Sequence, residues 1–100
     1  MDKNKIVIES IASEYKITVE QLMGKSRLKH IAKPRKMACF MLYHPGGMSL
    51  NQVAKYMGYA DHTTALYHVN DYWYLCKCDD EFDEIGKRIF SQAIDVYETN

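Results

Sequence analysis

Signals that begin and end helices recur along this chain, and they constrain its fold more than any other feature. Two capping boxes, Thr18 with Gln21 and Ser49 with Gln52, pair a hydroxyl with a glutamine three residues later. In this arrangement each side chain satisfies a backbone N–H group at the start of a helix. Pro34 is tolerated in the first turn of a helix and disrupts a helix interior. Because these signals are closely spaced, we expect several short helices.

Apolar residues between these signals recur every three or four positions, which is the spacing of one face of an α-helix. The residues expected to face the core are Ile8, Ile11, Ala12, Tyr15, Leu50, Val53, Ala54, Met57, Ala65, Leu66, Val69, Trp73, Phe82, Ile85, Ile89, Ala93 and Val96. A short second helix is expected to run through Leu22 and Met23. From Pro34 to about His44 the side chains are apolar almost all round, which predicts a central, buried helix. No stretch alternates with the period of a β-strand. The sequence therefore predicts an all-α protein of about six helices.

Glycine and proline mark where these helices end. Gly24 and Gly58 are expected at helix ends, because glycine tolerates the left-handed backbone found there. The Pro-Gly-Gly run at 45–47 is expected to stop the central helix. Asp61 is expected to cap the start of the fifth helix, and the last helix is expected to run from about residue 80 to residue 97.

The composition is typical of a soluble globular protein. Hydrophobic residues make up 47% of the chain and charged residues 26%, and the length suits one domain over residues 1–100. The longest apolar run, at 37–43, is far shorter than the ~20 residues of a membrane span. No secretory signal opens the chain. We therefore expect a cytoplasmic protein, of bacterial, bacteriophage or plasmid origin, with no membrane partner.

The cysteines and histidines give no sign of a metal or catalytic site. The cysteines, Cys39, Cys76 and Cys78, form an odd set without the spacing of zinc ligands, and we expect buried or half-buried thiols. Residues 23–26 imitate the end of a phosphate-binding loop, but Val19 stands where that motif needs a glycine. The histidines have no visible nucleophile or carboxylate partner. We predict no metal, no cofactor, no nucleotide and no enzymatic activity.

The formal net charge is zero, but the charges are unevenly distributed. The segment 25–36 contains six basic residues and no acid, whereas five of the six residues at 79–84 are acidic. One interpretation is two solvated segments of opposite sign, and the acidic segment also suits the first turn of a helix. The other is a polarised molecule whose basic side meets a polyanion.

Residues 50–73 have the local pattern of a helix-turn-helix. The small side chain of Ala54 allows two helices to cross closely, and Gly58 permits the turn that follows. The second helix opens with Asp61-His62-Thr63-Thr64. These short side chains can donate to or accept from base edges when the start of a recognition helix enters the major groove. The alternative is that Asp61 and Thr64 only cap the helix.

These residues resemble the C-terminal DNA-binding domain of the bacterial replication initiator DnaA. The stretch 58–66 reads Gly-Tyr-Ala-Asp-His-Thr-Thr-Ala-Leu, where the family usually has Gly-Gly-Arg-Asp-His-Thr-Thr-Val-Leu-His. Segments 15–22, 25–27 and 32–35 match other hallmarks of the domain in the same order. The resemblance runs from about residue 6 to residue 90. It implies a Trp-repressor-like helical fold and sequence-specific binding of double-stranded DNA, related to recognition of a replication origin.

The resemblance also implies a role for individual residues. Bases in the major groove would be read at the start of the fifth helix, and Arg27 would reach into the adjacent minor groove, where A·T-rich DNA concentrates negative potential. The remaining cations would hold phosphates, and Tyr67 stands where the family has a histidine. The predicted DNA-contacting residues are Arg27, Lys29, Lys33, Arg35, Lys36, Asp61, His62, Thr63, Thr64 and Tyr67.

Three departures from the family leave an alternative function open. Tyr59 and Ala60 replace a glycine and an arginine of the family pattern, and the loss of a cation beside the recognition helix weakens DNA binding. The family's ATPase module is not expected in this chain. The alternative is a protein-interaction module that kept the fold and lost DNA, with a protein partner in replication or regulation. Its aromatic face would comprise Tyr67, Tyr72, Trp73 and Tyr74.

Overall fold

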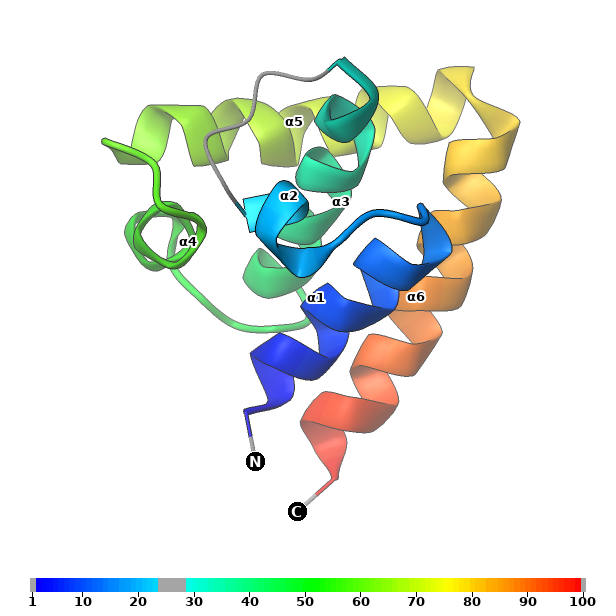
Figure 1. The fold of residues 1–100 in the computed structure, drawn as a ribbon, viewed down its shortest axis with the longest axis horizontal. Helices are drawn as coiled ribbons and strands as arrows, with labels where there is room; N and C mark the ends of the chain where they lie inside the picture. Colours follow the sequence, from blue (N-terminus) through cyan, green and yellow to red (C-terminus); the bar gives the residue numbers. More distant parts are fainter. Residues whose placement is uncertain (1, 24–28, 100) are drawn as a thin grey trace.

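Helices account for all of the regular secondary structure in the residues that the structure, a computed structural model, describes, namely 2–23 and 29–99. The elements in chain order are α1 (Lys3–Glu14), α2 (Val19–Met23), the short 3₁₀ helix η1 (Lys29–Ile31), α3 (Ala32–Tyr43), α4 (Leu50–Met57), α5 (His62–Cys78) and α6 (Asp80–Glu98) (Figure 1). The predicted all-α fold is confirmed.

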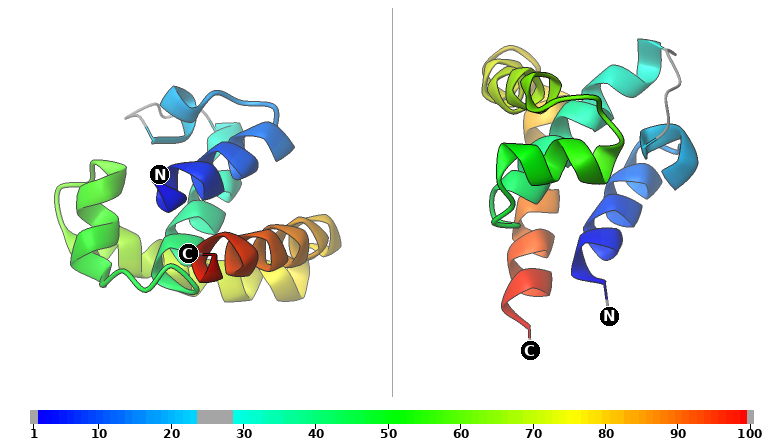
Figure 2. Two further views of the ribbon diagram at one scale, coloured as in Figure 1. Left: turned by 90° about the horizontal axis from the view of Figure 1, so that it is seen from below. Right: turned by 90° about the vertical axis from the view of Figure 1, so that its left-hand side faces the viewer.

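Helix α3 lies at the centre, as its apolar sequence predicts. It packs against α1, α4, α5 and α6, and all of its residues from Met37 to Leu42 are buried. Helix α5 crosses one end of the molecule, while α1 and α6 lie side by side and bring the two termini to the other end (Figures 1 and 2). This arrangement leaves the first turn of α5 at an outer corner of the fold.

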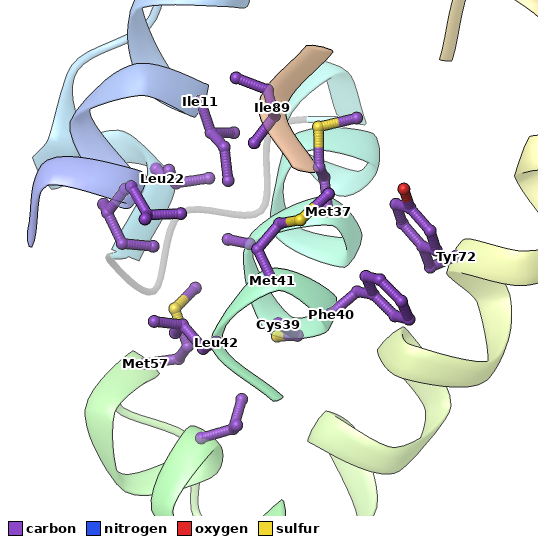
Figure 3. Close-up of a cluster of buried hydrophobic side chains, with 14 of the residues drawn as sticks. Ile11, Leu22, Met37, Cys39, Phe40, Met41, Leu42, Met57, Tyr72 and Ile89 are labelled. Carbon is purple, nitrogen blue, oxygen red and sulfur yellow. The ribbon is translucent and has the colours of Figure 1, made fainter. Parts of the chain in front are cut away.

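The core is made of side chains from five helices that converge on α3. Figure 3 shows Met37 and Met41 of α3 near Ile11 and Ile89, while Leu42 lies near Met57. On the α5 side, the rings of Phe40 and Tyr72 stack at a centroid distance of 4.0 Å and an interplanar angle of 4°. Such contacts stabilise the position of α5 through both buried area and ring stacking.

The predicted caps are present. The backbone N–H of Thr18 donates to Gln21 Oε1 and that of Gln21 donates to Thr18 Oγ1, both at 3.0 Å. Ser49 and Gln52 form the same reciprocal pair, at 2.8 and 3.1 Å. Each box satisfies two backbone donors. The helix end expected at Gly24 lies outside the described residues. A cap that we did not predict begins α6, where Asp79 accepts from the N–H of Phe82 at 3.0 Å.

The predicted inner face of α5 is wrong at Trp73, and Leu66, which was also expected there, is only half-buried. Trp73 is 57% exposed, whereas its neighbour Tyr72 is buried. The buried positions 65, 69 and 72 are spaced by four and three residues, which keeps them on one face. Trp73 lies eight residues after Ala65, about 80° around the axis from it at 100° per residue, so its side chain leaves the buried stripe.

The cysteines also differ in part from expectation. All three are free thiols, with Cys39 buried, Cys76 half-buried and Cys78 exposed. Burial raises the pKa of the Cys39 thiol to about 12, so it stays protonated and behaves as a small apolar side chain. Among the described helices, none combines the length and the apolar character that a membrane span requires.

Candidate nucleic-acid interface

Helices α4 and α5 are joined by a tight turn. The backbone of Gly58 is left-handed, with φ of +81°. Its N–H donates to the carbonyl oxygen of Lys55 at 3.3 Å, and the N–H of Tyr59 donates to that of Ala54 at 2.8 Å. These two bonds close the end of α4 in the manner of a Schellman motif. The chain therefore reverses over residues 58–61, and α5 packs on α4 as the second helix of a helix-turn-helix.

The first turn of α5 presents polar side chains to solvent. Asp61 is the N-cap, and its Oδ1 accepts from the N–H of Thr63 at 2.8 Å. The side chains of Asp61, His62 and Thr64 are exposed, and Thr63 is half-buried. Asp61 thus caps the helix as expected, but this cap does not bury the turn. The positive end of the helix dipole lies at the same place and favours an anionic ligand.

The polar surface continues along one side of α5. Tyr67 follows Thr64 by three residues and Thr63 by four, so these side chains are neighbours on the helix surface. Tyr67 is 62% exposed. Asp71 lies four residues further on and is also exposed. Tyr67 therefore shares one side of α5 with Thr63 and Thr64, while Asp61 and His62 lie exposed at the tip of the same helix.

Two predicted phosphate-binding lysines are paired with acids of the fold. Lys36 Nζ lies 3.4 Å from Asp71 Oδ2, halfway along α5. Lys33 Nζ donates to Asp79 Oδ2 at 2.6 Å, next to the start of α6. This hydrogen bond raises the pKa of Lys33 and lowers the pKa of Asp79, and each of the two pairs joins an exposed side chain to a half-buried one. They lower the positive charge that α3 presents to solvent.

Arg35 is used inside the fold. Its Nε donates to the carbonyl oxygen of Leu22 at 2.9 Å, and its second terminal nitrogen donates to that of Gln21 at 3.0 Å. These carbonyls belong to the end of α2, where the last groups of a helix lack partners within it. A cation there also complements the negative end of the helix dipole. Arg35 therefore holds the end of α2, immediately before residues 24–28.

A half-buried cluster lies behind the turn, and we did not predict it. The Tyr59 ring faces the His68 imidazole at a centroid distance of 5.6 Å, and the Tyr59 hydroxyl lies 3.8 Å from the Cys39 thiol. The Tyr59 side chain thus joins the turn to both α3 and α5. The one signal in the sequence was an aromatic residue where the family has glycine.

The imidazole of this cluster is poorly solvated. His68 Nδ1 is buried and has no hydrogen-bond partner within the described residues. Burial lowers the pKa of His68, and the charges of Lys36 and Arg35 lower it further, while Asp71 opposes them. Neutral His68 therefore fits this position better than the cation.

Two further predicted contacts belong to the segment before α3. Arg27 lies outside the described residues. The backbone of Lys29, the first residue of η1, lies just before α3. In the described part of the chain, no three His, Cys, Asp or Glu side chains are close enough to hold a metal ion.

Comparison with known proteins identifies the family. A family model described as "Bacterial dnaA protein helix-turn-helix" matches residues 5–71, from α1 to the middle of α5. This chain belongs to that family. The DnaA-type helix-turn-helix is a DNA-binding domain related to replication initiation.

Individual DnaA proteins and a solved structure extend the match. The chromosomal replication initiator protein DnaA of Synechococcus sp. (strain JA-2-3B'a(2-13)) is 34% identical over 62 residues, which is 62% of this chain and 13% of that protein. The DnaA of Crocosphaera subtropica is 29% identical over 89 residues, 85% of this chain and 20% of that protein. A crystal structure of a DNA replication initiation factor superposes with a TM-score of 0.81 and 26% identity, over 94% of this chain and 29% of that one.

The DnaA relatives are thus much longer than the part that they share with this chain. The chain spans 13% and 20% of the two relatives described above. The structural match reaches beyond the family model to include α6. What is common to all of them is therefore the helix-turn-helix domain.

Proposed function

We propose that this chain binds double-stranded DNA in a sequence-specific manner, with the start of α5 in the major groove. The observation that carries the proposal is the exposure of Asp61, His62 and Thr64 at the free end of a helix-turn-helix. A recognition helix contacts base edges with its N-terminal residues. Membership of the DnaA helix-turn-helix family supports the same mode.

The side chains at this end suit base edges of different kinds. Threonine hydroxyls at 63 and 64 can donate or accept, and their methyl groups can contact the thymine methyl. The Asp61 carboxylate can accept from cytosine N4, and His62 can act as donor or acceptor. Tyr67, one turn further along the same side of α5, extends the contact toward the groove wall. We assign these five residues to sequence choice.

The lysines differ in how well they are placed for phosphates. Asp71, the partner of Lys36, lies nine residues after His62, which is about 14 Å along α5 at 1.5 Å per residue. This is comparable with the ≈ 12 Å width of the major groove, so Lys36 suits a backbone that borders the groove. Asp79, the partner of Lys33, lies 17 residues after His62, about 25 Å away. Lys33 is therefore a peripheral contact.

Arg27 and Lys29 are assigned to DNA by the family resemblance. Arg27 would enter the minor groove next to the site of α5, and Lys29 would hold a phosphate there. Arg35 supports them by fixing the end of α2, from which the segment 24–28 departs. The function proposed is confined to these 100 residues: DNA binding related to origin recognition, and not the ATPase chemistry of a complete initiator.

Selection from a random duplex library with the purified chain tests the proposal and gives the preferred site. At low salt we expect His62→Ala and Arg27→Ala each to weaken binding to that site by about tenfold, because a good base contact is worth ≈ 1–3 kcal/mol. Lys36→Ala should weaken all duplexes alike. Lys5→Ala, which removes an exposed lysine of α1, is the matched control. Failure of the wild-type chain to bind any duplex at low salt overturns the proposal.

A protein-interaction module is the second candidate, favoured by the pairing of Lys33 and Lys36 with acids. Salt distinguishes the two functions. Affinity that depends on several lysine–phosphate contacts falls steeply between 50 and 200 mM salt, on the order of 10³-fold or more for six to ten contacts. An apolar protein interface responds little to salt over the same range.

A further inference from the structure

A groove lined by aromatic rings lies between α3, α5 and α6. Its volume is about 390 Å³, and its lining includes Phe40 and His44 of α3, Trp73 of α5 and Phe90 of α6. The Trp73 indole meets the Phe40 ring edge-on at a centroid distance of 5.0 Å, and His44 lies 5.7 Å from Phe90. None of these residues belongs to the proposed DNA-contacting set.

Trp73 is a large apolar side chain that this groove leaves in contact with solvent. Its side chain is 57% exposed, and it lines a groove whose surface is mainly apolar. Continuous apolar patches mark interaction sites, whereas single exposed apolar residues do not. Tryptophan is also enriched among the residues that dominate protein interfaces. The groove is therefore a candidate binding surface for a partner that covers it.

The groove has the two features that a two-fold symmetric dimer contact needs on each copy. It offers an apolar anchor, Trp73, and a concave apolar surface that can receive one. Its rim carries both charges, since Lys87 Nζ lies 3.1 Å from Asp83 Oδ2, one turn away on α6. In a two-fold pair each residue meets the same surface of its partner, so Lys87 of one copy can face Asp83 of the other. A partner whose surface carried charges of only one sign could pair with Lys87 or with Asp83, but not with both.

We propose that the groove is a self-association surface, with a second copy of this chain as its occupant. Each Trp73 is placed in the groove of the other copy, and each Lys87 beside the other copy's Asp83. The contact is centred on one anchor per chain. It therefore forms a weak, concentration-dependent dimer rather than an obligate one.

The location of the groove on α5 determines how far apart the proposed dimer places its two DNA-contacting helix ends. Asp71 and Trp73 are two residues apart, so they point about 200° apart around the α5 axis, and the self-association surface leaves the side of α5 that carries Tyr67 and Asp71 uncovered. Trp73 lies ten residues from Thr63, about 15 Å along α5. A two-fold axis next to Trp73 separates the two recognition ends by roughly 30 Å, close to the ≈ 34 Å of one DNA turn. This consequence rests on the proposed DNA-binding function.

Self-association is tested first without DNA. Sedimentation of the full chain between about 1 µM and about 1 mM covers the range of weak complexes. Trp73 is the single tryptophan, so its fluorescence emission should shift to shorter wavelength as the dimer forms. We expect Trp73→Ala to abolish the dimer. Tyr67→Ala, which removes an equally exposed ring of α5 outside the groove, should leave it intact. A wild-type chain that stays monomeric with unchanged emission overturns the proposal.

A charge-complementation experiment tests the geometry of the pair. Asp83→Lys gives a rim with two cations, and Lys87→Asp gives a rim with two anions. Each variant alone should associate less than the wild type because of repulsion, and an equimolar mixture should restore the dimer. Circular dichroism of each variant verifies its fold. A mixture that associates no better than its components overturns the proposed contact.

An experiment with DNA distinguishes a failure of the self-association proposal from a failure of the proposed DNA-binding function. If both hold, two copies should bind cooperatively to sites one helical turn apart, and Trp73→Ala should remove the cooperativity while keeping the affinity for a single site. Dimerisation without DNA binding would overturn only the proposed function. DNA binding by a chain that is monomeric throughout would overturn only the self-association.

Discussion

Lys36 Nζ lies 3.4 Å from Asp71 Oδ2, so a lysine proposed to hold phosphate is paired with an acid of the recognition helix. Asp71 is exposed on the same side of α5 as Tyr67. A phosphate that approaches Lys36 therefore meets a carboxylate beside it. In the proposed complex this acid acts against DNA binding twice, as a competitor for Lys36 and as a like charge facing the DNA backbone.

Asp71→Asn should tighten binding to every duplex by about fivefold at low salt, which is ~1 kcal/mol for a solvated charge pair. The gain should shrink as salt rises, because screening weakens the repulsion. Fluorescence anisotropy with a preferred and a scrambled duplex measures both effects. Asp95→Asn removes an equally exposed acid from α6 and is the matched control. Equal affinities of the Asp71 and Asp95 variants would contradict the prediction.

Arg35→Ala should destabilise the fold by about 2 kcal/mol, because hydrogen bonds to charged groups are worth ~1.5–3 kcal/mol. Two of its nitrogens donate to carbonyl oxygens at the end of α2, which the substitution leaves without these donors. Urea unfolding followed by circular dichroism gives the change. Arg88→Ala breaks an exposed ion pair with Glu14 and should cost less than ~1 kcal/mol. If the two variants are equally stable, the bonds from Arg35 to α2 contribute little to the fold.

His68 should make stability depend on pH. Burial lowers its pKa in the folded state below the ordinary value of 6.5. The unfolded chain therefore binds more protons in this range, and stability rises with pH. The stabilisation that comes from keeping His68 neutral is fully present above pH 6.5. It is lost as the pH falls below 6.5 toward the lowered pKa of His68. We expect the free energy of unfolding to fall between about pH 7 and pH 5.

Replacing the imidazole tests this assignment. His68→Phe keeps a ring against Tyr59 and removes the titration, so its unfolding free energy should change less over the same pH range than that of the wild type. Tyr59→Phe, which keeps the ring that His68 faces, should keep the wild-type pH dependence. A pH profile of the His68 variant that parallels the wild type would place the titration elsewhere.

The helices and their caps were predictable because they depend on local sequence. The box formed by Ser49 and Gln52 involves residues three positions apart, and its hydrogen bonds form as predicted. The inner face of α5 was less certain, since Tyr72 and Trp73 are adjacent aromatic residues and periodicity alone did not separate them. Which of the two is buried depends on where α3 places Phe40, with which Tyr72 stacks.

The cap at the start of α5 was also predictable, but the partners of the basic residues were not. Asp61 caps α5 through a contact two residues along the chain. Lys36 and Asp71, by contrast, are 35 positions apart and meet because of the way α3 crosses α5. The hydrogen bond from Arg35 to the Leu22 carbonyl oxygen at the end of α2 likewise depends on how the helices pack. A pattern of charges in the sequence shows where cations are, and only the packing shows which acids and carbonyls they meet.

The close approach of Gly86 to Tyr72 holds α6 against the recognition helix, and a double-mutant cycle can measure it. A Cβ atom at Gly86 would lie 2.6 Å from the Tyr72 hydroxyl oxygen and 3.4 Å from Cζ. Gly86→Ala should therefore cost about 1–3 kcal/mol of unfolding free energy through overpacking. Tyr72→Phe removes the clashing oxygen, so the double variant should recover most of that loss. Losses that simply add would show that the clash is relieved elsewhere.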